Sequence, residues 1–246
     1  LVGRSISTDE LLGHDAVFLA TGAGLPAFMG IPGENLNNVY SANEFLTRVN
    51  LMHAEAFPEF DTPVMHAARV AVIGGGNVAM DAARVARRLG AKVSLIYRRG
   101  EEEMPARRAE VVHAKEEGIE FVTCANPTRI LGEGCVTGIE CVRMSLCEID
   151  ASGRRSPEPI RGSEFSLDVD MVIQAIGTSP NPLLVSLIPG LERARRGNVV
   201  VDEDGRTSIP HVYAGGDIAT GAATVIEAMG SAKRAAAAIN AMLKAE

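Results

Sequence analysis

The sequence predicts an α/β protein in which a doubly wound parallel sheet with an antiparallel β-meander is inserted into a second, discontinuous domain. Three observations predict this fold. Short apolar runs alternate with helical periodicity over residues 69–123, as they do in a parallel sheet with crossover helices. Strand-like runs joined by a polar hairpin follow, over residues 128–169. The pattern D-x-V-x-x-A-x-G occurs on either side of these segments, at residues 15–22 and 170–177.

The composition is that of a globular protein and excludes several classes of function. Of the 246 residues, 46% are hydrophobic and 22% are charged, which is ordinary for a folded domain. The net charge of −7 argues against a general nucleic-acid binder, which needs a basic face. No run of about 18 apolar residues predicts a membrane span. The chain starts at Leu1 without a signal-peptide pattern, and we expect a cytoplasmic fragment of a longer protein.

The doubly wound segment is predicted as three strands that alternate with two helices. Its strands are continuous apolar runs, which is typical of a parallel sheet buried on both faces. Gly90 and Gly118 follow the two helices, where the C-terminal cap favours glycine. In chain order we expect a strand at 69–73, a helix at 77–89, a strand at 92–97, a helix at 107–117 and a strand at 119–123.

The flanking segments contain further strands and two more helices. A helix is predicted over residues 41–52, because Ser41 and Glu44 have the spacing of a capping box. A long alanine-rich helix is predicted over residues 223–243. Strands are expected at 15–20, 128–131, 135–149, 164–169, 171–176, 198–201 and 211–213, with a linker at 57–63 and a polar hairpin at 150–161.

The repeated D-x-V-x-x-A-x-G pattern sets the expected domain boundaries. Each copy precedes a proline-containing loop that ends in Ile-Pro-Gly, which suggests two related corners of one domain. We therefore divide the chain into residues 1–40 (first part of the flanking domain), 41–180 (inserted domain with a linker helix) and 181–246 (second part of the flanking domain).

A glycine-rich turn follows the strand at 69–73 and opens the next helix. The turn fits the dinucleotide fingerprint G-x-G-x-x-A in its required strand–turn–helix context. Its residues are Gly74, Gly75, Gly76, Asn77, Val78 and Ala79. Gly74 permits the tight turn, Gly76 lets the backbone approach a pyrophosphate, and Ala79 permits close packing of helix and strand. The alternative is a tight turn that binds no ligand. We expect a bound dinucleotide.

The end of the next strand indicates which dinucleotide binds. Tyr97, Arg98 and Arg99 stand about 20 residues after the glycines, where an NAD site carries an acidic residue and an NADP site an arginine. Two guanidinium groups suit a doubly charged 2′-phosphate. The alternative is a solvated basic turn that the acidic run 101–103 balances. We expect NADP.

The remaining candidates are weaker. Gly215, Gly216 and Asp217 follow an apolar strand, and Asp217 either accepts hydrogen bonds from a polyol or caps a turn. No Ser–His–Asp signature occurs and the five histidines are scattered, so we assign no catalytic side chain. The cysteines lack C-x-x-C spacing, and we expect reduced thiols and no bound metal. They are Cys124, Cys135, Cys141 and Cys147.

These motifs together resemble the pyridine-nucleotide–disulfide oxidoreductase superfamily. More narrowly, the chain looks like the small (beta) subunit of NADPH-dependent glutamate synthase and its relatives, which include the flavoprotein subunit of NADH-dependent ferredoxin:NADP oxidoreductase. The motifs that carry the likeness are V-A-V-I-G-G-G-N-V-A-M-D-A-A-R (70–84), Y-R-R-x-x-x-x-M-P-A (97–106), A-x-G (175–177), Y-A-G-G-D-I (213–218) and Y-S-A-N-E-F-L-T-R-V-N (40–50).

The resemblance implies an FAD domain interrupted by an NADP domain. It implies crossover corners at Ala20-Thr21-Gly22 and Ala175-Ile176-Gly177. Hydride would pass between NADPH and FAD, and no side-chain acid or base would be needed. It also implies contacts to the flavin from Gly216, Asp217, Ala223, Thr224 and Val225.

The chain lacks the family's N-terminal iron–sulfur region and its first G-x-G-x-x-G motif. We therefore expect NADP in this chain and FAD in the parent protein, together with an iron–sulfur domain and a partner synthase or ferredoxin-type subunit. Three alternatives stay open: an NADP–ferredoxin subunit, a sulfide dehydrogenase subunit, and an inert nucleotide-binding module. We also expect the fragment to form a homodimer through residues 181–246.

Overall fold

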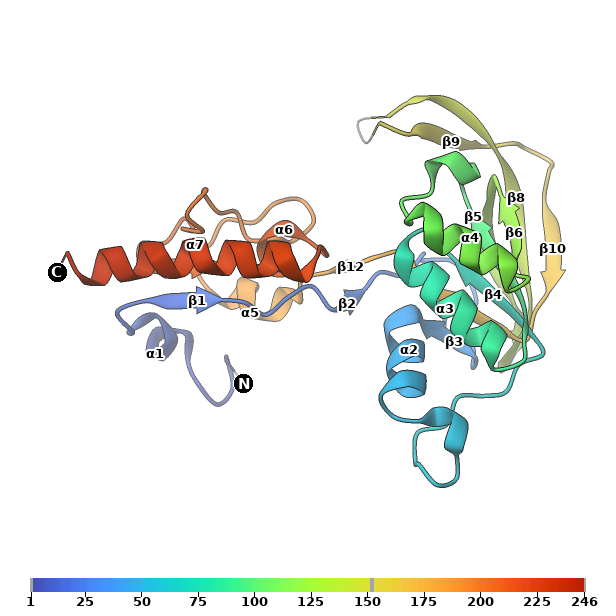
Figure 1. Ribbon diagram of the computed structural model, residues 1–246, viewed down its shortest axis with the longest axis horizontal. Coiled ribbons are helices and arrows are strands. Elements are labelled where there is room, and N and C mark those ends of the chain that lie inside the picture. The colour runs from blue at the N-terminus through green and yellow to red at the C-terminus, as the bar shows by residue number, and fades with distance from the viewer. Residues whose placement is uncertain (1, 151–152, 246) are drawn as a thin grey trace. The chain divides into compact units, whose positions relative to one another are not determined.

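The computed structural model describes residues 2–150 and 153–245 (Figure 1). The chain forms two compact units. Residues 27–176 form one unit, which we call the insert unit, and residues 1–26 and 177–246 form the other, which we call the flanking unit. Residues 27–40, placed with the flanking domain in the sequence analysis, pack in the insert unit, because a strand at Val39–Ser41 pairs with its central sheet.

A five-stranded parallel sheet is the centre of the insert unit. The predicted strand at 69–73 and that at 92–97 form with the expected bounds, and the sheet confirms the α/β fold. The strand at Val39–Ser41 is an edge strand that the sequence analysis missed, because its three residues carry no apolar run. The strand order is β3 (Val39–Ser41), β11 (Met171–Gln174), β4 (Arg69–Ile73), β5 (Lys92–Tyr97) and β6 (Glu120–Thr123).

Three helices cover one face of this sheet (Figure 1). They are α2 (Ala42–Asn50), α3 (Asn77–Arg88) and α4 (Arg108–Glu116). The predicted N-terminal cap of α2 is confirmed, because the Ser41 hydroxyl accepts a hydrogen bond from the Glu44 amide at 3.2 Å. The small residues Ala79, Ala82, Ala83 and Ala86 of α3 are buried, and they let the helix lie close against the strands.

The other face of the sheet packs against the antiparallel meander (Figure 1). The long strand β8 (Cys135–Ile149) lies between β7 (Ala125–Glu133) and β10 (Phe165–Asp168), and its far half pairs with β9 (Arg155–Pro159). The polar hairpin predicted at 150–161 therefore contains a strand. The prolines at 157 and 159 hid it from the sequence analysis, although an edge strand tolerates proline.

The flanking unit holds two short pairs of strands and the C-terminal helix. β1 (Val17–Leu19) pairs in parallel with β13 (Val212–Ala214), and β2 (Leu25–Pro26) pairs antiparallel with β12 (Thr178–Ser179). The two chain segments that lead to the insert unit thus run side by side. The helices are α1 (Thr8–Leu12), α5 (Pro182–Leu187), α6 (Asp217–Thr220) and α7 (Val225–Leu243), and the insert unit adds short 3₁₀ turns at Ala54–Ala56 and Glu101–Glu103.

One strand prediction in the flanking unit is wrong. Residues 198–201 form no strand in the described structure, apart from an isolated bridge between Val199 and Arg193. The side-chain Nδ2 of Asn198 instead donates to the carbonyls of Asp217 (3.2 Å) and Ile218 (3.4 Å). A short apolar run does not by itself specify a strand, because a loop can bury it equally well. Hydrogen bonds from a side chain to the backbone, such as those of Asn198, favour a loop over a strand.

None of the helices that the structure describes is long and apolar enough to cross a membrane.

Candidate functional site

The glycine turn joins the end of β4 to the start of α3, and its three glycines have different surroundings. A Cβ on Gly74 would lie 2.3 Å from the Ala175 carbonyl oxygen, and Gly74 has a φ of 140°. A Cβ on Gly75 would lie 2.7 Å from the Tyr97 ring. A Cβ on Gly76 would meet nothing within 4 Å. The first two glycines therefore serve packing, and Gly76 leaves open space in front of the turn, which is the space a dinucleotide requires.

The N-terminus of α3 opens onto this space. The Gly76 carbonyl accepts the amides of Ala79 (3.0 Å) and Met80 (3.2 Å). No side chain caps the helix. Asn77 and Val78 are exposed, and their amides precede the first intrahelical hydrogen bond. Unsatisfied amides at the positive end of a helix dipole favour a bound phosphate.

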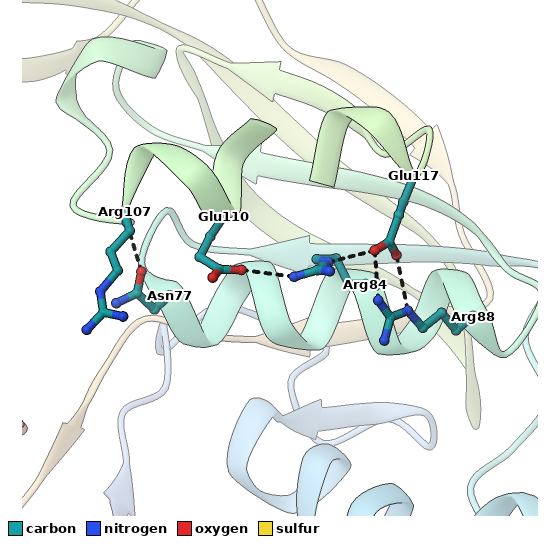
Figure 2. A network of polar contacts seen from close by, with 6 residues as sticks. All are labelled: Asn77, Arg84, Arg88, Arg107, Glu110 and Glu117. Carbon is teal, nitrogen blue, oxygen red and sulfur yellow. Dashed lines mark hydrogen bonds and ion pairs between the residues drawn. The ribbon is translucent and has the colours of Figure 1, made fainter. Parts of the chain in front are cut away.

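The loop 98–107 returns from β5 to the glycine turn. The Tyr97 hydroxyl donates to the Glu103 carbonyl at 2.9 Å, inside the loop. At its end, the Ala106 amide donates to the Gly75 carbonyl at 3.1 Å. The Arg107 amide donates to the Asn77 side-chain oxygen at 2.9 Å (Figure 2). The predicted site residue Asn77 thus holds this loop against the start of α3.

The two arginines at the end of β5 have opposite environments. Arg98 is exposed, and its side chain makes no hydrogen bond or ion pair with any residue that the structure describes. Arg99 is only 5% exposed. Its guanidinium contacts a carboxylate oxygen of Asp150 at 2.5 Å and the Arg155 carbonyl at 2.7 Å. Of the two arginines predicted to bind phosphate, Arg98 therefore has a guanidinium that is available to a ligand. The guanidinium of Arg99 is already bonded within the protein.

The acidic run that follows is neutralised by its own partners. Glu101 pairs with Lys115 at 2.7 Å, Glu102 lies 3.7 Å from Arg108, and Glu103 pairs with Arg155. The hydrogen bond from Arg155 lowers the pKa of the buried Glu103 carboxyl. Each of these carboxylates has a cation beside it. The acidic run therefore lowers the positive electrostatic potential around Arg98 only slightly.

The candidate residues outside the glycine turn form separate groups. In the insert unit, the Ala175 amide donates to the Ile73 carbonyl at 2.8 Å, which places it beside the turn. In the flanking unit, Gly22 and Gly177 have φ values of 69° and 107°, and Thr21 is exposed. Both glycines therefore adopt a backbone conformation that other residues rarely take.

The other predicted residues of the flanking unit lie at the starts of α6 and α7. Gly216 has a φ of 72°, and its amide donates to the Ser231 hydroxyl at 2.8 Å. The Asp217 carboxylate accepts the Ala223 amide at 3.3 Å, so it does serve a turn. Thr224 forms a reciprocal capping box with Glu227. Val225 is 75% exposed.

Arg107 is a residue of this region that the sequence analysis missed. Its place directly after the M-P-A motif and just before α4 was the available signal. The described residues bring no three His, Cys, Asp or Glu side chains together as a metal site. All four cysteines are free thiols, and burial raises the pKa of Cys141 to about 12.

Comparison with known proteins gives the family. The family model for pyridine nucleotide-disulphide oxidoreductases matches residues 3–240. The chain is 43% identical to the NADP(+)-dependent formate dehydrogenase subunit beta of Moorella thermoacetica, covering 99% of this chain and 34% of that protein. It is 39% identical to the glutamate synthase [NADPH] small chain of Azospirillum brasilense, covering 100% of this chain and 52% of that protein.

The fold also matches solved structures. FprA of Mycobacterium tuberculosis in complex with NADPH superposes with a TM-score of 0.77 at 23% identity, covering 99% of this chain and 66% of that one. The chain spans a third to a half of the length of the two relatives above. The matches cover both units and confirm the family indicated by the sequence motifs. The chain belongs to the pyridine nucleotide-disulphide oxidoreductase family, as a relative of the glutamate synthase small chains.

Proposed function

We propose that this chain forms the pyridine-nucleotide side of an NADPH-dependent flavin oxidoreductase of the glutamate synthase small-subunit type. The observation that carries the proposal is the open Gly76 position in front of the uncapped start of α3, with the available Arg98 nearby in sequence at the end of β5. FAD, when bound, takes up the hydride that NADPH gives. The protein's own groups bind and orient the nucleotide, and no side-chain acid or base takes part.

The insert unit would hold NADP through its backbone and its basic groups. The pyrophosphate would lie in front of the turn that Gly74, Gly75 and Gly76 form, at the open Gly76 position, and would accept hydrogen bonds from the amides of Asn77 and Val78. The exposed guanidinium of Arg98 would favour the 2′-phosphate, whereas that of the neighbouring Arg99 is paired with Asp150. Ala175 borders the turn on the other side.

The flanking unit would contribute to the flavin side. We infer that Thr21 and Gly22 on one connection, and Gly177 on the other, lie at the crossover corners. Conformations with positive φ at the two glycines support this role, because they bring the backbone close to a ligand without a Cβ. Two residues at the start of α6, Gly216 and Asp217, and two at the start of α7, Thr224 and Val225, would complete the flavin contacts from this chain. The rest of the parent protein would supply the adenosine half of the FAD site.

Partners follow from the names of the relatives. The relatives are a "small chain" and a "subunit beta", which supports assembly with a larger partner subunit. We propose an iron–sulfur domain in the parent protein and a synthase or ferredoxin-type partner. The second candidate function of this chain is that of an electron-transfer subunit, which the likeness to a formate dehydrogenase subunit beta supports. The free thiols suit a reducing compartment, and we propose the cytoplasm.

The proposal is tested by titrating the chain with NADPH and NADH in a calorimeter and then adding FAD. We expect NADPH to bind at least about tenfold more tightly than NADH, the factor that one charge-assisted contact supports. Equal affinities would refute the NADP assignment, and a chain that binds neither nucleotide would refute the proposed function. A bound flavin spectrum would show that this chain suffices for FAD.

A further inference from the structure

The loop 98–107 is held to the glycine turn at both ends. At its start, the Tyr97 ring packs so closely on Gly75 that a Cβ there would lie 2.7 Å from the ring. At its end, the Ala106 amide donates to the Gly75 carbonyl at 3.1 Å. Both ends of the loop therefore contact Gly75. As a result its first and last residues, Arg98 and Arg107, flank the same turn.

Both flanking arginines have available guanidinium groups. Arg98 and Arg107 are exposed, and neither side chain makes a hydrogen bond or an ion pair within residues 2–150 and 153–245. The backbone of Arg107 is engaged: its amide donates to the Asn77 side-chain oxygen at 2.9 Å, and its carbonyl accepts hydrogen bonds from the amides of Glu110 and Val111. Figure 2 shows Arg107 beside the start of α3. The side chain of the next residue, Arg108, lies 3.7 Å from Glu102, and this ion pair is its one polar contact among the residues that the structure describes.

Arg99 is committed elsewhere. Its two hydrogen bonds go to Asp150 and to the backbone of Arg155, while the Arg155 side chain pairs with Glu103. One ion pair joins Arg99 to Asp150, at the end of β8, and the other joins Glu103 to Arg155, at the start of β9. We call Arg99, Glu103, Asp150 and Arg155 the Arg99 cluster. It holds the end of β8 and the start of β9 against the loop that begins at Arg98.

From this arrangement, and resting on the proposed NADP site, we propose that Arg98 and Arg107 bind the 2′-phosphate and that Arg99 is a positioning residue. Two unpaired guanidiniums match the charge of a phosphate dianion. A guanidinium that is buried and already paired would have to exchange one carboxylate for another anion, which gains little. Arg99 acts instead by fixing the loop that carries Arg98.

The first experiment measures the dissociation constants of NADP⁺ and NAD⁺ by calorimetry at fixed ionic strength. We expect Arg98→Ala and Arg107→Ala each to weaken NADP⁺ about tenfold, as the loss of one charge-assisted contact does, with little change for NAD⁺. Arg108→Ala is the matched control and should leave both constants within about twofold, because an exposed charge contributes little. If Arg107→Ala weakens both nucleotides equally, the residue meets the pyrophosphate and the proposal is wrong. It is equally wrong if Arg107→Ala behaves like Arg108→Ala.

The second experiment separates positioning from direct contact at Arg99. We expect Arg99→Ala and Asp150→Asn to weaken NADP⁺ in the same direction, by about threefold each, and the double variant to be no weaker than either, since residues of one network are not additive. A direct contact predicts opposite signs, because Asp150→Asn would free Arg99 and tighten NADP⁺. If Arg99→Ala does not fold, the sign of the Asp150→Asn effect decides alone. Opposite signs, or no effect of either variant, overturn the positioning role.

These outcomes are distinct from failure of the proposed function. A wild-type chain that does not prefer NADP⁺ to NAD⁺ would refute the proposed function itself. A wild-type chain that prefers NADP⁺, but whose preference survives Arg107→Ala, would refute only the present inference.

Discussion

At the scale of single residues, the glycines of the turn have two roles: Gly74 and Gly75 allow close packing, and Gly76 leaves room for the nucleotide. Gly76 has a φ of −91° and open space where a Cβ would stand. We predict that Gly76→Ala leaves the free energy of unfolding within about 1 kcal/mol of the wild type, because alanine is compatible with this backbone. The same methyl group would occupy the space of the pyrophosphate, and we expect NADPH binding to weaken at least about tenfold, or about 1.4 kcal/mol. Urea unfolding and calorimetry measure the two effects.

Gly74→Ala is the contrasting variant. Its Cβ would clash with the Ala175 carbonyl, and its φ of 140° is strained for any residue with a side chain. We expect a loss of about 2–4 kcal/mol of stability, in the range of backbone strain with a steric clash. Equal stability of the two variants would contradict the division of the turn into packing and binding glycines.

The cysteines give a second prediction at this scale. Cys135 is exposed at the start of β8, whereas Cys141 is fully buried and its pKa is raised to about 12 by burial. The thiolate is the reactive form, so Cys141 should stay unmodified at pH 8. We expect a maleimide reagent to label Cys135 in the native protein within minutes and Cys141 only in denaturant. Peptide mass spectrometry identifies the labelled sites, and rapid native labelling of Cys141 would show that the core opens.

At the scale of elements, ion pairs join α3 to α4. Arg84 donates to Glu117 at 2.8 Å and to Glu110 at 2.9 Å, and Arg88 donates to Glu117 at 2.9 Å (Figure 2). These bonds, from Arg88 first, lower the pKa of Glu117. We predict that Glu117→Gln costs about 1–2 kcal/mol at pH 7, as charged hydrogen bonds between partly buried groups do.

The pH dependence of that loss follows from the direction of the shift. A carboxyl whose pKa is lower in the folded state stabilises the fold above its unfolded pKa, which is about 4.3. This stabilisation disappears as the pH falls through the folded pKa. The stability gap between wild type and Glu117→Gln should therefore close in acid, as urea titrations at pH 7 and at low pH would show. Glu116→Gln, an exposed neighbour, should show no gap at either pH.

The elements also show how far the sequence could predict this fold. The strands at 69–73 and 92–97 were predictable to the residue, because buried parallel strands are continuous apolar runs. β3 was not, because it has three residues and depends on pairing with β11, whose Val172 lies 133 positions after its partner Val39. The residues of the candidate site were predictable by motif, but their division of labour was not. The burial of Arg99 depends on Asp150, which reaches it only when β8 and β9 fold over the end of β5.

At the scale of the whole molecule, the start of α7 exposes several apolar side chains. In the flanking unit, Val225, Ile226 and Met229 are 75%, 81% and 54% exposed at the start of α7. Clustered exposed apolar side chains favour association. We predict that the chain dimerises at high concentration and that Ile226→Glu weakens the dimer, which light scattering would follow. Leu243→Glu, at the other end of α7, is the control and should change little. A chain that stays monomeric at all concentrations would contradict this prediction.

The insert unit, by contrast, has the features of an independent domain. Its two apolar clusters lie on the two faces of its own sheet, and its first strand, β3, pairs with its last, β11. The ends of the unit therefore meet within one sheet, a geometry that lets an inserted domain fold alone. We predict that residues 27–176, expressed alone, unfold in one cooperative transition and bind NADPH within about threefold of the full chain, since the proposed contacts all lie in this unit. A matched sample that carries Gly76→Ala should fold equally well and lose the nucleotide. Loss of NADPH binding by a folded 27–176 would mean that the flanking unit supplies part of the nucleotide site.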